Sequence, residues 1–443
     1  MSVATVTVLG AGLAGCEAAW QCATRGVAVR LVEMKPKQFT PAHHAADFAE
    51  LCCSNSLRSD ALSNAVGLLK EEMRRVGSLI MEAADATRVP AGSALAVDRD
   101  KFAKYVTERV KNHPLIEVVE AEADAIPEGV TVIATGPLTS APMANAIAAL
   151  TGEEGLYFHD AVAPIVDFSS IDMDVAFFAS RYDKGDADYI NCPMTREQYD
   201  AFYQALITAR EAELKDFDRE SQSAPKVFEG CMPVEVMARR GYDTLRYGPL
   251  KPVGLVDKRT GKESFAVVQL RKENREGTMY NLVGFQTHLA HPEQKRVFSM
   301  IPGLENATFL RYGVMHRNTY LRSPGFLADT YATLARPDLF FAGQMTGVEG
   351  YIESAGSGLV AGINAARAAR EMPALHFPRH TMLGAMAAYV ANGGIGDFLP
   401  MNANFGIVDR LDHKVRGGKA ARNEALSARA LEALDGVLGE AKA

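Results

Sequence analysis

The residue whose surroundings most favour covalent chemistry is Cys231, in the stretch from Phe228 to Gly241. Pro233 suits the first position of a short helix, and Gly241 suits its end. Cys231 would then lie just before the helix, where the positive end of the helix dipole increases the thiolate fraction of a cysteine. Such a thiolate is a nucleophile, whereas the commoner alternative for a single cysteine is burial in a core.

A second pair of thiols lies in the segment from Phe48 to Leu57, which contains Cys52 and Cys53 and is otherwise rich in polar residues. The segment follows the irregular, proline-containing stretch 36–41. Binding and catalytic residues occur on loops more often than on the elements that form the core. We therefore expect this segment to belong to a functional site.

A glycine-rich loop near the N-terminus indicates that this ligand is a dinucleotide. The apolar run 5–9 enters Gly10-Ala11-Gly12-Leu13-Ala14-Gly15, and a second apolar run ends at Glu33. In a βαβ unit, Gly10 allows the tight turn, Gly12 lets the backbone approach a pyrophosphate, and Gly15 lets the helix pack on the strand. Glu33 is placed to accept hydrogen bonds from ribose hydroxyls, which favours FAD or NAD over NADP. The alternative is a glycine-rich turn without a ligand.

Two later stretches are expected to return the chain to the same site. Ala134-Thr135-Gly136 follows a predicted strand and resembles the turn by which many FAD domains come back to the cofactor. Gly343 follows another predicted strand, and Gly350 and Gly356 open a predicted helix that runs to Arg370. The N-terminus of this helix would stabilise an anionic reduced flavin. Close helix packing is the alternative explanation for these glycines.

The elements that must position these residues predict an α/β protein. We expect a Rossmann-like FAD-binding domain of the glutathione-reductase type with a smaller α+β insertion domain. The expected division is 1–164 for the first part of the FAD-binding domain, 165–285 for the insertion, and 286–443 for the second part with a helical tail. Residues 65–84 are predicted as one amphipathic helix, and 265–270 and 280–285 as paired strands.

The composition is that of an ordinary globular enzyme, with 443 residues, 48% hydrophobic, 23% charged and a net charge of -7. No apolar stretch approaches about eighteen residues and the first strand leaves no room for a signal peptide, so we expect a cytoplasmic protein without a membrane contact. The spacing of the six cysteines favours neither a metal site nor a disulfide scaffold. Residues 231–330 hold 15 Lys and Arg against 9 Asp and Glu, which predicts a phosphate-binding face or, alternatively, scattered solvated charges.

Several longer motifs occur together in this chain. They are the glycine-rich loop, Thr40-Pro41-Ala42-His43, Cys53-Ser54-Asn55-Ser56, Arg88-Val89-Pro90-Ala91-Gly92, Phe228-Glu229-Gly230-Cys231-Met232-Pro233-Val234-Glu235 and Arg311-Tyr312-Gly313-Val314-Met315-His316-Arg317-Asn318-Thr319. The set resembles the folate- and FAD-dependent tRNA (uracil-5-)-methyltransferase family, called TrmFO or Gid, over about residues 5–405.

The resemblance implies methylation of the uridine at position 54 in the T-loop of tRNA. The carbon would come from 5,10-methylenetetrahydrofolate, and reduced FAD, replenished by NAD(P)H, would supply electrons. The functional cysteines of the family map onto Cys53 and Cys231 in this chain. Cys231 would add to carbon 6 of uracil and Cys53 would remove the proton at carbon 5. The base must be extruded from the T-loop to reach them. His316, which could stack on the folate, Arg317 and Asn318 are the substrate-binding candidates.

Three alternatives remain open at this stage. The same chemistry could act on ribosomal RNA, or the chain could be a flavin-dependent tRNA-uridine modifying protein of the MnmG/GidA kind. The Cys53 and Cys231 motifs and the expected absence of an extra C-terminal domain argue against the MnmG/GidA alternative. The third is a flavoprotein that binds RNA or senses redox state without methyl transfer.

Overall fold

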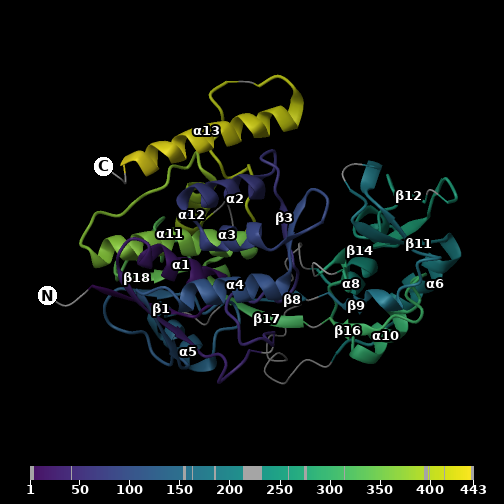
Figure 1. Ribbon diagram of the computed structural model, residues 1–443, viewed down its shortest axis with the longest axis horizontal. Coiled ribbons are helices and arrows are strands. Elements are labelled where there is room, and N and C mark those ends of the chain that lie inside the picture. Colours follow the sequence, from purple (N-terminus) through teal and green to yellow (C-terminus); the bar gives the residue numbers. More distant parts are fainter. Residues whose placement is uncertain are drawn as a thin grey trace.

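The structure is a computed structural model that describes residues 4–40, 42–152, 156–161, 163–183, 186–212, 232–257, 259–273, 277–313, 315–393, 398, 400–413 and 415–440. The chain forms two units that lie side by side, each around its own sheet and its own buried core (Figure 1). This arrangement is the expected α/β fold, a Rossmann-like domain with a smaller α+β insertion.

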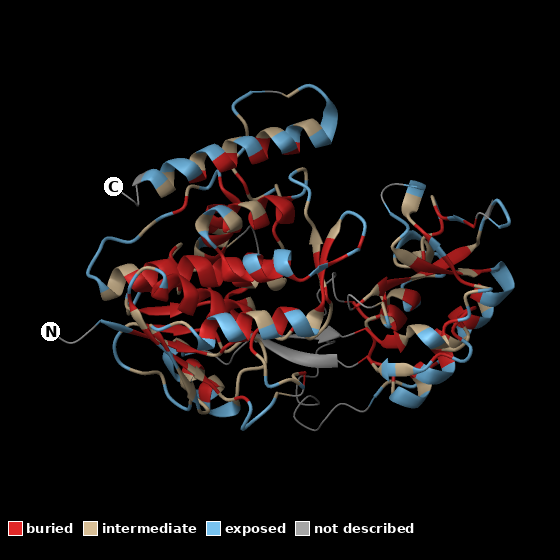
Figure 2. Cartoon of the chain, viewed as in Figure 1, coloured by how far each residue is buried: buried red, intermediate tan, exposed pale blue. Residues whose placement is uncertain are grey.

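The first unit is built on a five-stranded parallel sheet in the order β18-β7-β1-β2-β6. Its strands are β1 (Thr5–Leu9), β2 (Ala28–Glu33), β6 (Ile116–Glu120), β7 (Thr131–Ile133) and β18 (Leu339–Phe341). The central strand β1 is apolar and mostly buried (Figure 2), because helices cover a parallel sheet on both faces.

The helices of this unit include a tightly crossed central pair. A Cβ atom on Gly358 would lie 2.2 Å from the backbone oxygen of Ala14, and one on Gly362 would lie 2.6 Å from the Cα of Ala18. Only glycine therefore lets the two backbones approach this closely. The helices are α1 (Leu13–Ala23), α2 (Ala65–Val76), α3 (Leu79–Ala86), α4 (Arg99–Lys111), α5 (Ala141–Thr151), α11 (Tyr351–Ala369), α12 (Met382–Asn392) and α13 (Gly418–Glu440).

The prediction of one helix over 65–84 is wrong, because the chain breaks between α2 and α3. Gly77 adopts the left-handed conformation with φ +86°, which ends α2. The Ser78 side chain then caps α3 by accepting a hydrogen bond from the amide of Met81 at 3.2 Å. The apolar spacing continues through the break, so hydrophobic periodicity alone did not reveal it.

A small three-stranded sheet lies at the edge of the first unit, beside the second unit (Figure 1). Its strands are β3 (Ser56–Ser59), β4 (Arg88–Val89) and β5 (Ala94–Val97), and β3 follows directly after the segment that contains Cys53.

The second unit is built on a six-stranded antiparallel sheet in the order β10-β11-β14-β15-β9-β16. Its strands are β9 (Ile165–Asp167), β10 (Phe177–Ala179), β11 (Tyr189–Met194), β14 (Ala266–Lys272), β15 (Met279–Leu282) and β16 (Phe309–Arg311). The predicted pairing of two strands over 265–285 is confirmed by β14 and β15, in which Leu270 faces Leu282.

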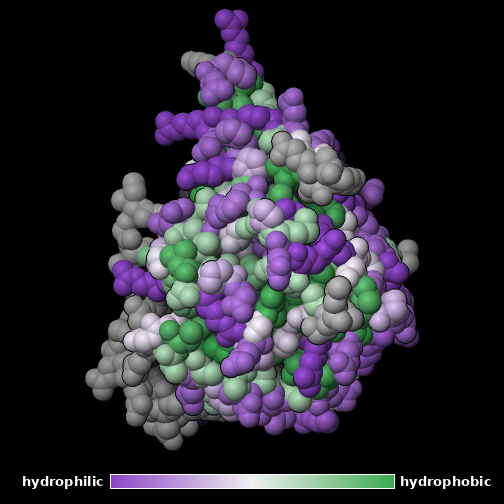
Figure 3. Space-filling model, turned by 90° about the vertical axis from the view of Figure 1, so that its left-hand side faces the viewer, coloured by the Kyte–Doolittle hydropathy of each residue, from purple (hydrophilic) through white to green (hydrophobic). Residues whose placement is uncertain are grey.

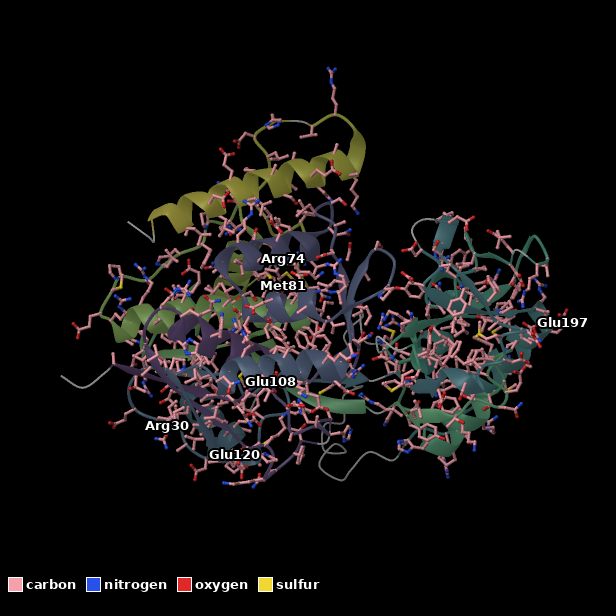
Figure 4. All side chains as sticks on the ribbon, in the orientation of Figure 1. Arg30, Arg74, Met81, Glu108, Glu120 and Glu197 are labelled. Carbon is pink, nitrogen blue, oxygen red and sulfur yellow. The ribbon has the colours of Figure 1, made fainter. Side chains whose placement is uncertain are left out.

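One face of this sheet packs on α6 (Arg196–Ile207), α8 (Val234–Arg239) and α10 (His291–Phe298), and these elements share the second core. The short helix α9 (Thr244–Tyr247) and the ribbon of β12 (Val256–Asp257) and β13 (Lys262–Glu263) complete the unit. In Figure 4, Glu197 of α6 marks its outer edge, whereas Arg74 and Met81 lie in the first unit.

The chain passes between the two units along β8 (Leu156–Ala161) and returns along β17 (Met315–Tyr320), which pair antiparallel. Residues 289–311 contribute α10 and β16 to the core and sheet of the second unit. The second core and sheet therefore include elements that follow residue 285.

Candidate active site

A cavity opens where the carboxyl ends of the five parallel strands meet. Its lining comes from the residues that follow each strand: Gly10 to Ala14 after β1, Met34 and Lys35 after β2, Ala121 to Ala123 after β6, Ala134 to Leu138 after β7, and Gly343 and Gln344 after β18. Ligands of open α/β sheets bind outside the carboxyl ends of the strands. The position agrees with a dinucleotide site.

The three glycines of the first loop differ in why the structure needs glycine at each position. Gly10 has φ +93°, and a Cβ atom there would lie 2.6 Å from the backbone oxygen of Ala134. A Cβ atom on Gly15 would lie 1.8 Å from the oxygen of Gly10. Gly12 differs, because nothing lies within 4 Å of the position that its Cβ atom would take. The first two glycines shape the loop, whereas Gly12 leaves open space beside the cavity.

Two helices begin at this cavity. Leu13 and Ala14 start α1, and Tyr351 and Ser354 belong to the first turn of α11. Unpaired amides and the positive ends of both helix dipoles therefore lie near the cavity, where they favour an anionic ligand.

Glu33 lies at the end of β2, lines the cavity and is buried. Its two carboxylate oxygens accept hydrogen bonds from the amides of Ala11, at 2.6 Å, and of Lys35, at 2.9 Å. Carboxylate oxygens have about two acceptor positions each, so both oxygens can also accept a hydroxyl donor. These contacts hold Glu33 against the glycine loop, in the place expected for a ribose contact.

The structure brings most of the predicted cofactor residues to this cavity. Gly10, Ala11, Gly12, Leu13, Ala14, Glu33, Gly136 and Gly343 all line it. Gly15, Gly350 and Gly356 are not among its lining residues. Gly350 precedes α11 with φ +118°, and a Cβ atom on Gly356 would meet Leu69 and Leu383 at 3.4 Å. Gly356 therefore lies between α2 and α12, away from the cavity lining.

Cys53 lines the same cavity and is held by the start of α11. Its Sγ lies 2.8 Å from the Tyr351 hydroxyl, which also accepts the Cys53 amide at 2.7 Å. Burial raises the pKa of Tyr351 well above its ordinary value. The phenol therefore keeps its proton at neutral pH and can donate it in a hydrogen bond to a thiolate at Cys53.

The neighbouring thiol differs in its environment. Burial first, and the adjacent Cys53 second, raise the pKa of Cys52 to about 12. Cys52 consequently stays a neutral thiol at physiological pH. Its backbone oxygen accepts hydrogen bonds from Arg99, at 3.1 Å, and from Arg311.

Sequence reasoning missed Tyr351 and Arg99 as parts of this site. Tyr351 follows the glycine-rich turn that was expected at the cavity, so its hydroxyl was a signal for a polar contact there. Arg99 carried no comparable signal, because only the fold brings α4 to the Cys52 segment.

Cys231 lies outside the residues that the structure describes. The helix predicted after it is present as α8, with Pro233 as its N-cap and Gly241 shortly beyond its end. The backbones of His316, Arg317 and Asn318 lie in β17, opposite Asp160, His159 and Phe158 of β8. Directly after β17, the amide of Leu321 donates to Met345 beside the cavity-lining Gln344, at 2.7 Å.

Together these residues fit FAD. The chain offers open space beside Gly12, two helix N-termini for the pyrophosphate and the flavin, and a fixed carboxylate for a ribose.

Among the described residues, no group of His, Cys, Asp or Glu side chains is arranged to hold a metal ion. Every helix in that part of the chain is too short or too polar to cross a bilayer. On the end of the first unit, hydrophilic and hydrophobic side chains are interspersed (Figure 3).

Comparison with known proteins agrees with this description. The family model described as glucose inhibited division protein A matches residues 5–373. The methylenetetrahydrofolate–tRNA-(uracil-5-)-methyltransferase TrmFO of Brevibacillus brevis is 59% identical over 434 residues, which are 98% of each chain. The protein of the same name from Ligilactobacillus salivarius is 60% identical over 429 residues, which are 97% of each chain.

Among solved structures, Aquifex aeolicus GidA in its form I crystal has a TM-score of 0.69 and 17% identity, over 98% of this chain and 76% of that chain. This likeness concerns the fold. The chain therefore belongs to the TrmFO family, whose members match it over almost their whole length, and to the broader family described as glucose inhibited division protein A.

Proposed function

We propose that this chain is a folate-dependent tRNA methyltransferase that forms 5-methyluridine at position 54 of the T-loop. The carbon donor is 5,10-methylenetetrahydrofolate, and NAD(P)H regenerates the reduced cofactor. The names of the relatives support the reaction. The observation that carries the proposal is the position of Cys53, which lines one cavity together with the glycine loop and the start of α11.

FAD, when bound in this cavity, supplies the electrons that convert a one-carbon unit at the methylene level to a methyl group. The protein residues that hold it are the glycine loop, Glu33 and the first turns of α1 and α11. Cys53 lines the same cavity, so FAD held by these residues would lie close to its thiol.

The cysteines act on the uracil. Carbon 5 of uracil is a poor nucleophile, and addition of the Cys231 thiolate to carbon 6 converts the ring to an enolate that attacks an electrophilic carbon. Cys53 then removes the proton from carbon 5, which expels the carrier of the one-carbon unit as an amine and leaves an exocyclic methylene on carbon 5. A hydride equivalent, which bound reduced FAD would supply, makes this methylene a methyl group, and the enolate that results breaks the Cys231–carbon 6 bond and restores the ring. The Tyr351 hydroxyl, 2.8 Å from Cys53, favours the Cys53 thiolate that removal of the proton requires.

The enzyme works on RNA in the cytoplasm.

The test uses the purified, yellow protein with an unmodified tRNA transcript, methylenetetrahydrofolate and NAD(P)H. Mass mapping should find one new 5-methyluridine, at position 54. Cys231→Ala and Cys53→Ala should each keep bound FAD and abolish methylation. Methylation by either variant at the wild-type rate would remove that cysteine from the mechanism, and methylation of ribosomal RNA instead of tRNA would overturn the substrate.

A further inference from the structure

The segment from Leu51 to Asn55, which carries Cys53, is held by both units of the molecule. From the first unit, Arg99 and Tyr351 contact its backbone, and the Asn55 side chain donates to the backbone oxygen of Val97 at 3.0 Å. From the second unit, Arg311 donates to the oxygen of Cys52. The segment therefore lies between two sheets whose cores are separate.

Asn55 makes the densest of these contacts. It is 0% exposed, and its Nδ2 lies 2.8 Å from the oxygen of Lys272 and 3.1 Å from that of Glu273, at the end of β14. Its Oδ1 accepts a hydrogen bond from Nε of Arg271 at 3.2 Å. One asparagine two residues beyond Cys53 thus links a strand of the first unit to a strand of the second.

Arg271 completes the link from the second unit. Its Nη2 donates to the hydroxyl of Ser54 at 2.7 Å, and the side chain is buried. In β14, Val268 and Leu270 belong to the core on one face of the sheet, so the alternating residue Arg271 points to the other face, toward the first unit. The planar guanidinium contacts Ser54 and Asn55 simultaneously, a geometry that a lysine ammonium does not reproduce.

We propose that Asn55 and Arg271 are positioning residues for Cys53. The inference rests on the proposed function, in which Cys53 removes the proton from carbon 5. The two side chains fix the segment that follows Cys53, so that its amide and thiol stay on the Tyr351 hydroxyl and the thiol stays at the cavity. Arg271 is therefore engaged with the protein and does not serve as a contact for RNA phosphates.

The experiment compares Asn55→Ala and Arg271→Lys with Asn191→Ala as the matched control. Asn191 is also 0% exposed, and its Nδ2 lies 3.1 to 3.3 Å from three backbone oxygens, but all three belong to the second unit's own strands. The measurements on full-length holoenzyme are kcat and KM for the tRNA transcript, and hydrogen–deuterium exchange of the peptide that contains Cys53.

For both test variants we expect kcat to fall roughly 100-fold, the effect of a catalytic group displaced by about 1 Å. KM for tRNA should stay within about twofold, and the amides of Cys53 and Ser54 should exchange faster. Asn191→Ala should lower the melting temperature while keeping kcat and this exchange at wild-type values. Because Arg271→Lys retains the positive charge, a low kcat in this variant indicates that Arg271 acts by positioning and not by attracting phosphate.

Three results would overturn the proposal: unchanged exchange of the Cys53 peptide in both variants, a wild-type kcat for Arg271→Lys, or an equal loss of kcat in Asn191→Ala. If Asn55→Ala does not fold, Arg271→Lys carries the same test. The exchange measurement needs no substrate. A wild-type enzyme that fails to methylate tRNA would thus refute the proposed function, while the exchange data would still decide how the segment is held.

Discussion

Cys53 and Tyr351 are 298 residues apart in the chain and 2.8 Å apart in space. The contact distinguishes two adjacent thiols. Cys53 faces a protonated hydroxyl at the cavity, whereas the pKa of Cys52 is raised to about 12 by burial. At the residue scale, the surroundings of each sulfur therefore determine how readily Cys52 and Cys53 ionise, although the two residues are adjacent in the chain.

This difference predicts selective alkylation. Between pH 7 and pH 9, iodoacetamide should modify Cys53 much faster than Cys52, because a thiol with a pKa of about 12 ionises by less than roughly one part in a thousand at pH 9. Mass mapping of the modified peptide measures the ratio.

Cys52→Ala should retain methyl transfer within about twofold of wild type, since a thiol that stays neutral takes part in no proton transfer. Faster labelling of Cys52 than of Cys53, or loss of activity in Cys52→Ala, would contradict this assignment of roles.

At the element scale, the crossing of α1 and α11 brings two helix N-termini to one cavity. The helices can cross this closely because Gly358 and Gly362 of α11 lie against the backbone of α1 at Ala14 and Ala18. The glycines within α11 thus hold the crossing together, and the ligand-facing positions lie at the starts of the two helices.

Two glycine substitutions separate these roles. Gly12→Val should be colourless, because its side chain enters open space where the pyrophosphate is expected, and its melting temperature should match that of wild type stripped of FAD. Gly358→Val should lose FAD and destabilise the fold by about 3 kcal/mol, because the helices must move apart. The measurements are flavin absorbance and thermal unfolding. Yellow Gly12→Val protein would argue against the cofactor placement.

A buried carboxylate joins two helices of the same unit. Glu72 of α2 is 0% exposed and accepts hydrogen bonds from the amides of Met382, at 2.7 Å, and Leu383, at 2.8 Å, which start α12. Burial raises the pKa of Glu72 to about 8. The folded protein therefore binds a proton that the unfolded chain, with an ordinary pKa of about 4.3, releases.

From this shift we expect the free energy of unfolding of wild type to fall, relative to Glu72→Gln, as the pH rises from about 4.3 to 8. The slope is at most about 1.4 kcal/mol per pH unit, and the contribution is complete below the unfolded pKa and lost above the folded one. Urea unfolding at pH 5, 6, 7 and 8 measures the difference between the two proteins. A difference that does not change with pH would show that Glu72 is ionised in the folded state.

At the scale of the whole molecule, the ribbon of β8 and β17 carries the chain between two separately packed units. We propose a division at this ribbon, with the insertion running from residue 163 to residue 313. Part of the basic charge counted between residues 231 and 330 is used inside the protein. Arg271 contacts Asn55 and Ser54, Arg259 pairs with Asp257, and the Arg246 guanidinium lies 3.7 Å over the Phe265 ring.

An ion pair across the two units offers a test of their coupling. Arg99 of α4 and Glu273, just after β14, approach to 2.7 Å, and both side chains are largely buried. Arg99→Met should cost about 3–5 kcal/mol, because it leaves an unpaired buried carboxylate, whereas adding Glu273→Met should restore part of that loss. A double-mutant cycle by urea unfolding measures the coupling, and additive effects would show that the two residues do not interact.

The local pattern determined much of this protein. The turn conformation of Gly10, the close packing at Gly15, β1, α1, β2 and the β14–β15 pair all follow from short-range spacing of glycines and apolar residues. Such features depend on residues close together in the chain, so the sequence alone predicts them. It also predicted the short helix after Cys231 from Pro233 and Gly241.

Only the tertiary structure decided which of the adjacent thiols meets Tyr351, that Gly356 packs between helices, and that Asn55 joins two sheets. It also decided that side chains between residues 289 and 311 pack in the second core. These outcomes depend on contacts between segments far apart in the chain, where burial and the crossing of whole elements set the neighbours of each side chain. Local spacing carries no record of those neighbours, which is why the sequence could indicate the segment that carries Cys53, whereas only the fold selected the contacts that hold it.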